Sequence, residues 1–303
     1  MGLSQIRQGH IYHAVKEVHE EYNYPIAALC KLGGISRASY YKWLHRKETS
    51  RERQNRHLAD KLEQLHEKHP DMGYRRLNDK LYHDENIKVK DKRIRRICSI
   101  KQIKSCLKYR YDGCTRVSRN PGFVAENILN RDFKAERLNE KWVTDVTEFK
   151  YGTSFDDIHK LYLSAILDLC DRRPVAYVIS DHNDNALVLE TFDKAMEENP
   201  DAHPIFHSDR GYQYTSRAFH QKLKDAGMIQ SMSRVAHCTD NGPMEGFWGI
   251  LKREMYYKHK FHTKEELVKA ITEYMEYYTK QRPQRGLGIL TPMEYHEKLL
   301  LVA

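Results

Sequence analysis

The chain has 303 residues, enough for more than one folded domain, because single hydrophobic cores stop growing efficiently before that length. Its 51 lysines and arginines outnumber its 42 acidic residues, and the formal net charge of +9 favours a polyanionic partner such as nucleic acid. The sequence has no apolar run long enough to cross a bilayer and no signal-peptide core, and its six cysteines form no close pair. These features argue against a membrane, secreted disulfide-rich or cysteine-based zinc protein, and we expect a protein of the reducing cytoplasm.

Apolar spacing and turn residues predict three helices at the start of the chain. Apolar residues recur at helical intervals over residues 10–21. Pro25 suits the first turn of a second helix, which a glycine pair ends. Ser36 is a favourable N-cap for a third helix over residues 37–44.

A short helix, a glycine turn and a second polar helix form a helix-turn-helix pattern, in which the second helix enters the major groove of DNA. Trp43 and Leu44 are expected to pack in the core. A helical hairpin with no DNA role is the alternative. We expect DNA contacts from the cap and the polar side chains of the third helix, namely Ser36, Arg37, Ser39, Tyr40 and Lys42.

A second helical, basic unit is predicted after a polar linker at residues 45–56. Leucines at helical spacing precede predicted helices over 73–81 and 91–97, and the isoleucines of the last helix are expected to be buried. Residues 86–119 hold twelve lysines and arginines against two acidic residues. A solvated basic face is the alternative to DNA binding here. Exposed arginines at this density can hold phosphates, so we expect DNA contacts from Arg75, Arg76, Arg93, Arg95 and Arg96.

The pattern changes from helical to strand-like at Trp142. Before it, residues 109–139 lack periodicity and are predicted to be a connector. Three consecutive strands joined by short polar turns predict an antiparallel meander, and two more strands and two helices complete an α/β sheet before a helical tail. The expected strands are 142–150, 159–169, 174–180, 203–207 and 229–233, and the expected helices are 185–197, 216–226, 243–257, 264–278 and one after Pro292.

Three acidic residues stand at informative places in these elements: Asp145 in the first strand, Asp209 at the end of the fourth, and Glu245 at the start of the next helix. Each has an ordinary explanation: a hydrogen bond from a hydroxyl such as that of Thr147, a turn, or a helix-capping glutamate. A buried carboxylate in a central strand is costly unless a cation or donors satisfy it. Together the three therefore favour a hard-oxygen site for divalent metal, as used in phosphoryl transfer on nucleic acid.

The motifs around these acids resemble the integrase core of bacterial insertion-sequence transposases. More narrowly, the chain is similar to the second-frame (orfB-type) product of the family whose elements encode two overlapping reading frames, and the resemblance runs from about residue 20 to residue 298. The motifs that carry it are Trp142-Val-Thr-Asp-Val-Thr147, His207-Ser-Asp-Arg-Gly-Tyr-Gln-Tyr214, Ser231-Met-Ser233, Asp240-Asn-Gly-Pro-Met-Glu-Gly-Phe-Trp248, Arg282-Pro-Gln-Arg285 and Thr291-Pro292.

The resemblance implies an RNase H-like mixed five-stranded sheet and a DDE transposase that cuts and joins DNA at element ends. Asp145, Asp209 and Glu245 are its implied catalytic residues and would hold two Mg²⁺ or Mn²⁺ ions. Lys252 follows Glu245 by about two helical turns and is expected to hold a DNA phosphate. His207 and Asn241 are expected to be supporting residues.

The implied organisation has five parts: a helix-turn-helix unit (1–47), a second helical DNA-binding unit (48–108), a connector (109–139), the catalytic core (140–258) and a helical extension (259–303). The expected partners are double-stranded DNA, as terminal inverted repeats and target, and a second copy of the chain. The resemblance also implies a first-frame protein or fusion with a helix-turn-helix and a leucine zipper, because this sequence lacks a sustained heptad run. The expected location is the cytoplasm, at the bacterial nucleoid.

Two other functions are weighed against this one. The first is another RNase H-like nuclease, which the predicted N-terminal DNA-binding units argue against. The second is a catalytically silent or domesticated DNA-binding regulator, which the three intact carboxylates argue against. A retroviral-type integrase is disfavoured because the N-terminal His-His-Cys-Cys zinc pattern is absent from the sequence.

Overall fold

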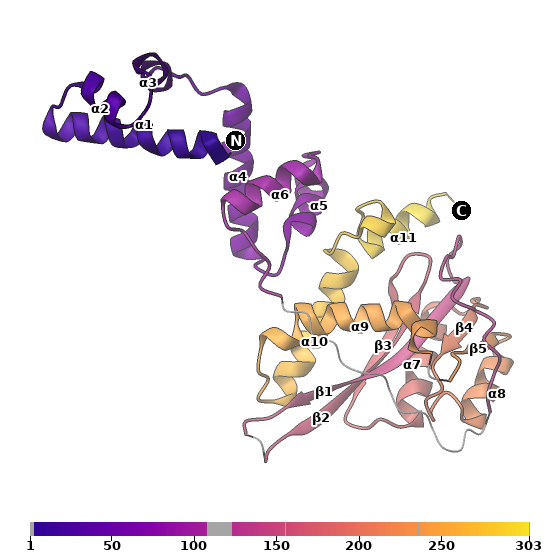
Figure 1. Cartoon of the computed structure of the whole chain (residues 1–303). Coiled ribbons are helices and arrows are strands. Elements are labelled where there is room, and N and C mark those ends of the chain that lie inside the picture. The colour runs from indigo at the N-terminus through magenta and orange to yellow at the C-terminus, as the bar shows by residue number, and fades with distance from the viewer. Residues whose placement is uncertain (1–2, 108–122, 155, 236, 303) are drawn as a thin grey trace. The chain divides into compact units, whose positions relative to one another are not determined.

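The computed structural model describes residues 3–107, 123–154, 156–235 and 237–302, so the basic segment 86–119 and the connector 109–139 fall partly outside it. The described chain separates into two compact units, Met1–Leu62 and Glu63–Ala303. Among the described helices, none is both long and apolar enough to span a membrane. Figure 1 labels the elements of both units.

The first unit is a small helical bundle. Its elements are α1 (Leu3–Tyr22), α2 (Ile26–Leu32), α3 (Arg37–Leu44) and the first part of α4 (Ser50–Lys68). Ser36 caps α3 as predicted, because its side chain accepts a hydrogen bond from the backbone N–H of Ser39.

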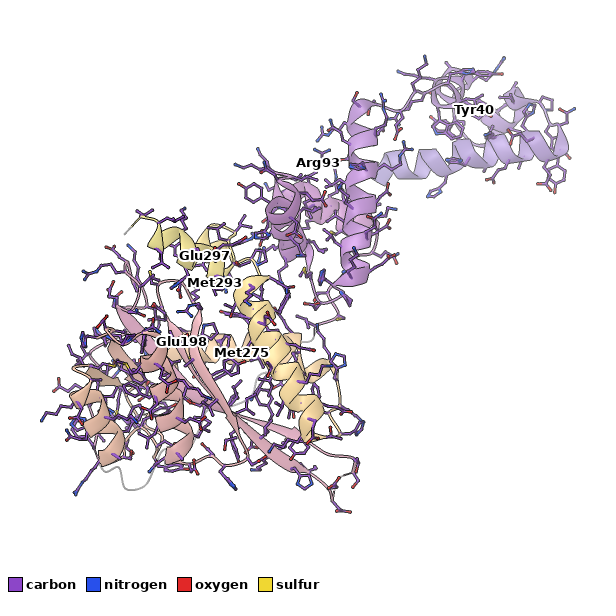
Figure 2. All side chains as sticks on the ribbon, turned by 180° about the vertical axis from the view of Figure 1, so that it is seen from behind. Tyr40, Arg93, Glu198, Met275, Met293 and Glu297 are labelled. Carbon is purple, nitrogen blue, oxygen red and sulfur yellow. The ribbon has the colours of Figure 1, made fainter. Side chains whose placement is uncertain are left out.

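The core of this unit is built around Val15, Cys30 and Tyr40, with Trp43 packed against it. Tyr40 is labelled among these helices in Figure 2. The placement of Trp43 in the core is therefore confirmed. The same prediction for Leu44 is wrong, since 38 % of its surface is exposed.

The second unit begins with a helical part, made of the end of α4, α5 (Tyr74–Glu85) and α6 (Asp91–Ile100). Leu77 and Leu81 of α5 and Ile94 and Ile97 of α6 are buried, which confirms the predicted apolar face of α6. Asn86 closes α5 in the left-handed conformation (φ 54°), a backbone geometry that asparagine tolerates.

A five-stranded mixed sheet of order β3-β2-β1-β4-β5 forms the rest of this unit, together with its covering helices (Figure 1). The first three strands pair antiparallel, so the predicted meander is confirmed, and β4 pairs in parallel with both β1 and β5. Strand β1 therefore lies at the centre. The strands are β1 (Lys141–Tyr151), β2 (His159–Asp168), β3 (Pro174–Ser180), β4 (Ile205–Ser208) and β5 (Ile229–Met232).

Each face of the sheet carries its own hydrophobic cluster. One joins Val143 and Phe149 of β1 to α9 and α10, and the other joins Trp142 of β1 to α7 and α8. This alternation follows from the two-residue period of a strand, which sends neighbouring side chains to opposite faces. The remaining elements are α7 (Asn185–Glu198), α8 (Arg217–Asp225), the 3₁₀ turn η1 (Cys238–Asn241), α9 (Gly242–Glu254), η2 (Tyr256–Lys258), α10 (Lys264–Lys280), η3 (Arg285–Leu287) and α11 (Pro292–Leu300).

Candidate active site

Asp145 lies on β1, and Asp209 directly follows the last residue of β4, the strand that pairs in parallel with β1. The pairing of β1 with β4 matches Lys141 with Ile205 and Val143 with His207. Continuing this register by two residues brings Asp145 beside Asp209, on strands that are about 5 Å apart. Both side chains are only partly exposed. The sheet topology thus joins two carboxylates that are far apart in the sequence.

The two carboxylates share an unfavourable electrostatic environment. Burial raises the pKa of Asp145 well above its ordinary value, and the charge of Asp209 raises it further. Burial also raises the pKa of Asp209, against the opposing effect of the Gly211 N–H, which donates a hydrogen bond to Oδ1 at 2.8 Å. Asp209 therefore does make a turn, but it does so beside a second buried acid.

Trp248 is the hydrogen-bond partner that orients Asp145. Its indole Nε1 donates to Oδ2 of Asp145 at 3.0 Å from the second turn of α9. The partner is thus an indole rather than the neighbouring hydroxyl of Thr147. Trp248 follows Glu245 by three residues, so the two side chains leave α9 on the same side.

Glu245 stands in the first turn of α9, and its side chain is exposed. The capping explanation does not hold, because Asn241 at the N-cap of α9 makes no side-chain capping hydrogen bond. Burial raises the pKa of Glu245, and its charge adds to the raised pKa of Asp145 more weakly than Asp209 does. Within the part of the chain that is described, three or more Asp, Glu, His or Cys side chains are nowhere gathered into a metal-binding group.

Hydrogen bonds from three segments hold the β1 backbone next to Asp145. Nδ2 of Asn241 donates to the Thr144 carbonyl at 3.0 Å, which ties the start of α9 to the strand. The hydroxyl of Thr144 donates to the Ala165 carbonyl and lies 3.3 Å from the hydroxyl of Tyr214. The turn after Asp209, the strand of Asp145 and the helix of Glu245 are therefore connected directly.

His207 supports the same region from β4. Its ring nitrogens lie 2.9 and 3.1 Å from the hydroxyls of Ser231 and Ser233 on and just after β5. Burial lowers the pKa of His207 to about 4, so the ring is neutral near pH 7. This arrangement fits the expected supporting role and leaves no proton-transfer role for the histidine.

Comparison with known proteins places this site in a family. The integrase core domain family matches residues 135–238, and a second integrase core domain family matches residues 245–300. The chain is 37 % identical over 277 residues to the putative transposase InsK of insertion sequence element IS150 from Escherichia coli K12, covering 91 % of this chain and 94 % of that protein. The chain belongs to the insertion-sequence transposases.

A second relative agrees with this assignment. An uncharacterized transposase-like protein of Haemophilus influenzae is 39 % identical over 220 residues, covering 71 % of this transposase and 97 % of that protein. The HTLV-2 integrase catalytic core, solved in complex with magnesium, is 17 % identical with a TM-score of 0.41 and covers 52 % of this chain and 96 % of that one. The fold is RNase H-like, as predicted, and the protein is a DDE transposase of an insertion sequence, a polynucleotidyl transferase acting on DNA.

The donor atoms at the centre of this transposase fit a divalent cation. Carboxylate and amide oxygens are the ligands that Mg²⁺ prefers. A cation would offset the burial that raises the pKa of both carboxylates and the charge of Asp209 that raises the pKa of Asp145 further. In addition, Oδ1 of Asn241 is buried and has no hydrogen-bond partner among the described residues. These residues therefore fit a divalent cation.

The predicted DNA-contacting residues of the first unit differ in their accessibility. Arg37 and Lys42 are exposed on α3. Ser36 and Ser39 are exposed but hydrogen-bonded to each other at the helix cap. Tyr40 is 1 % exposed, so its predicted contact with DNA does not agree with its place in the core of this unit.

The predicted contacts of the second unit divide in the same way. Arg75, Arg95 and Arg96 are exposed, and Arg93 is partly buried. Arg76 is already bound by Asp71 at 2.8 Å and by Glu254 at 2.9 Å. The ammonium group of Lys252 lies 5.4 Å above the ring of Phe149, on the face of β1 that carries Asp145.

Two supporting residues escaped the sequence-based analysis. Trp248 was part of a family motif but had no assigned role. Asp240 is fully buried directly before Asn241, where Arg234 and Arg131 bind it at 2.8 and 2.6 Å. These arginines hold its pKa far below the ordinary value. In the sequence, only its position in a family motif pointed to a role for Asp240, because its partners Arg234 and Arg131 come from two other segments.

Proposed function

We propose that Asp145, Asp209 and Glu245 are the catalytic carboxylates of this transposase. The single observation that supports the proposal is the parallel pairing of β1 with β4, whose last pair, Val143 with His207, stands two residues before Asp145 and Asp209. Both acids have raised pKa values, a common property of functional sites. The charge of Glu245 also acts on Asp145. Glu245 lies on α9, one turn before Trp248, the residue whose indole binds Asp145.

The three side chains would hold divalent cations, Mg²⁺ or Mn²⁺, with two ions per site. When bound, such ions supply positive charge that activates an attacking hydroxyl and stabilises the leaving oxygen. The role of the protein is to hold the carboxylates in place. Trp248 fixes the orientation of Asp145, and Asn241 fixes the backbone beside it. Lys252, on the same face, holds a phosphate near the scissile bond.

The substrate we propose is double-stranded DNA carrying the terminal inverted repeats of the element, and then the target DNA. Two copies of the chain act together on a pair of ends, with a first-frame helix-turn-helix and leucine-zipper protein or fusion, at the nucleoid in the cytoplasm. We propose the five-part organisation given above for these tasks. DNA contacts come from the exposed residues Arg37, Lys42, Arg75, Arg95 and Arg96, with Ser36, Ser39, Arg76, Arg93 and Lys252 in supporting contacts.

The substitution Asp145→Asn tests this function. It removes the charge while the amide oxygen can still accept the Trp248 hydrogen bond, so the fold should remain intact. We expect metal-dependent nicking at the 3′ ends of a duplex copied from the DNA flanking the reading frame to fall by roughly 10³-fold or more, with DNA binding unchanged. Nicking assays and gel-shift titrations measure the two properties.

Asp201→Asn is the matched control, because Asp201 is an exposed turn aspartate outside the site. It should nick like the wild type. Undiminished nicking by Asp145→Asn would refute the assignment of the catalytic carboxylates. Cleavage of an RNA–DNA hybrid without joining of DNA ends would instead identify another RNase H-like nuclease, and DNA binding without any cleavage would identify a regulator.

A further inference from the structure

The helical part of the second unit meets the C-terminal segment through charged contacts. Arg285, in η3, binds both oxygens of Asp79 on α5 through Nε at 2.8 and 2.7 Å. Its other two nitrogens bind the carboxylate of Asp91 at 2.9 and 3.0 Å. Asp91 is the first residue of α6, so one guanidinium holds both helices. These hydrogen bonds raise the pKa of Arg285 above its ordinary value.

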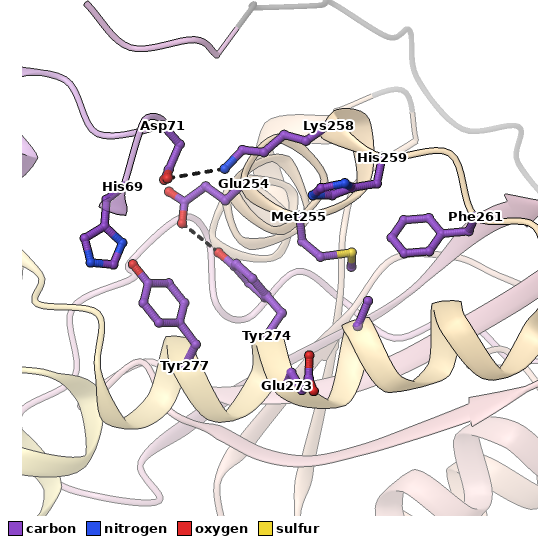
Figure 3. A pocket seen from close by; sticks show the side chains of 11 residues that line it. His69, Asp71, Glu254, Met255, Lys258, His259, Phe261, Glu273, Tyr274 and Tyr277 are labelled. Atoms are coloured by element: carbon purple, nitrogen blue, oxygen red, sulfur yellow. Dashed lines mark hydrogen bonds and ion pairs between the residues drawn. The ribbon is translucent and has the colours of Figure 1, made fainter. Parts of the chain in front are cut away.

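A second set of charges anchors the same helices to α9. Glu254, the last residue of α9, binds Arg282 through two hydrogen bonds at 2.8 and 3.0 Å and accepts a third from the Tyr274 hydroxyl at 3.0 Å. Arg76 of α5 also reaches Glu254, at 2.9 Å. Asp71 pairs with Arg76 and with Lys258, as Figure 3 shows for the lysine. We call these two sets, centred on Arg285 and Glu254, the ionic joint.

Charged groups make the contacts of this joint. The buried residues Leu77 of α5 and Ile94 of α6 belong to neither of the two hydrophobic clusters described for the sheet. A cavity of about 320 Å³ lies beside Glu254, lined by residues that include His69, Asp71 and Tyr277 (Figure 3). The charged pairs therefore help to fix where α5 and α6 sit on the core.

The ionic joint connects the proposed DNA-binding face of α6 with the helix that carries Glu245, α9. Arg95 and Arg96 are exposed about one helical turn after Asp91, which Arg285 holds. At the other side, Glu254 is nine residues after Glu245 on α9, a distance of about 14 Å along the helix. The basic face of α6 and the proposed catalytic face of α9 are thus linked through a few charge pairs.

We propose that Arg285 is a positioning residue that determines which phosphate of the bound DNA reaches the catalytic carboxylates. This inference rests on the proposed function of Asp145, Asp209 and Glu245. Arg285 touches no DNA in this role. It holds the phosphate-binding helix α6 at a fixed place relative to α9, so that the bound duplex presents one bond to the site.

The experiment maps cleavage of an end-labelled duplex, copied from the DNA flanking the reading frame, at single-nucleotide resolution. In Arg285→Ala, Asp79 and Asp91 lose their shared partner, so α6 loses its direct tie to η3 and is held only through α5, where Arg76 still reaches Glu254. Cleavage at the principal phosphate should fall by roughly 100-fold, as expected for an ångström-scale misplacement, and cuts at neighbouring phosphates should appear. Arg285→Lys, which keeps the charge but not the forked geometry, should restore the principal cut in part.

The matched control is Lys269→Ala, which removes one positive charge from an exposed pair with Glu273 on α10 outside the joint. It should cleave at the wild-type position. An unfolded Arg285→Ala protein would be recognised by its melting curve, and Arg285→Lys then carries the test through the distribution of its cuts. Cleavage by the folded variants only at the wild-type phosphate, at the wild-type rate, would overturn the inference. Absence of any cleavage by the wild type would instead contradict the proposed function.

Discussion

The indole of Trp248 makes a single polar contact at the centre of the site, with Asp145. Trp248→Phe removes this donor and keeps the aromatic packing against Phe247. A hydrogen bond to a charged group contributes about 1.5–3 kcal/mol, so nicking should fall by roughly 10- to 100-fold. The measurement is the single-turnover nicking rate with the enzyme in excess over DNA.

Trp142→Phe is the control for this change. Trp142 lies on β1 and is fully buried. Like that of Trp248, its indole donates one hydrogen bond, here to Asn139 at 3.2 Å, but its ring belongs to the hydrophobic cluster on the opposite face of the sheet. Its loss should lower stability without a specific effect on nicking. Equal nicking defects in the two variants would mean that Trp248 acts only through packing.

Asp168 at the end of β2 should make stability depend on pH. Burial, and then the charge of Asp171, raise its pKa to about 7, although two backbone N–H groups bind the carboxylate. Between pH about 4 and 7 the native state keeps a proton that the unfolded chain has released. The stability that this proton confers is therefore complete at low pH and is lost as the pH rises to 7, by about 1.4 kcal/mol per pH unit.

Asp168→Asn should remove that dependence. The unfolding free energy of the wild type minus that of the variant should decrease steadily from pH 4 to pH 7 and then stay constant, as measured by urea unfolding. Asp201→Asn, at an exposed turn, provides the baseline. A difference that does not vary over this range would show that Asp168 is ionised in the native protein.

Among single residues, family motifs in the sequence were sufficient to propose Asp145, Asp209, His207 and Asn241, and the structure shows Asp145 close enough to Asp209 for their charges to interact. It was not sufficient to predict the burial of Tyr40. An aromatic residue on a polar helix can face either DNA or the core, and only the packing of α1 against α3 decides between them. The partner of Asp145 was missed for a similar reason, since Trp248 comes from 103 residues away.

At the scale of elements, the turn between β4 and α8 is crowded by two side-chain ends at Gly211. A Cβ atom there would lie 2.9 Å from Oδ1 of Asp209 and 3.0 Å from Oε1 of Gln213. Gly211→Ala should therefore displace the Asp209 carboxylate and reduce nicking by roughly 10- to 100-fold, with the fold retained. Nicking rates and thermal unfolding test the two parts of this expectation.

Gly246→Ala is the contrasting substitution on α9. A Cβ atom at Gly246 would meet nothing within 4 Å, so alanine should stabilise the helix by about 0.5–1 kcal/mol and leave nicking unchanged. Wild-type nicking by Gly211→Ala would indicate that Asp209 can adjust without loss of function.

The elements themselves were largely predictable from the sequence. Alternating apolar residues and polar turns marked β1, β2 and β3, and Ser36 and Thr291 marked the starts of α3 and α11. The predicted first and last residues of the helices were less accurate. The first helix begins at Leu3 rather than at residue 10, and α9 ends at Glu254, before a 3₁₀ turn. Periodicity identifies a helix, but local hydrogen bonding decides its final turn.

For the molecule as a whole, the separate cores of the two units predict separate unfolding. Val15, Cys30 and Tyr40 form the buried centre of the first unit, apart from the two clusters of the sheet. Calorimetry should show a weaker transition for the first unit and a stronger one for the second. Tyr40→Ala should lower the stability of the first by about 3–5 kcal/mol.

Leu163→Ala, a fully buried change on β2, should instead shift only the second transition. Hydrogen exchange of α3 and β2 assigns each transition to its unit. A single transition that both substitutions move together would contradict independent unfolding.

Ion pairs between residues far apart in the chain could not be predicted from the sequence. Arg285 and Asp79 are 206 residues apart, and no periodicity or motif links an arginine in the tail to an aspartate in an early helix. The order of β4 between β1 and β5 was likewise not predicted, although it brings Asp145 and Asp209 together. The sequence supported the right family and suggested the three acids, while the approach of Asp145 to Asp209 depended on topology.

The position of α9 late in the chain has a consequence for protein synthesis. Asp145 and Asp209 are translated well before Glu245 and Trp248, and Asn241 cannot brace β1 until its own segment has emerged. A nascent or prematurely terminated polypeptide that stops after β5 would therefore carry the early helices with an incomplete centre. Such a fragment would lack the Trp248 hydrogen bond and the Asn241 brace, so the surroundings of Asp145 are complete only once α9 has been synthesised.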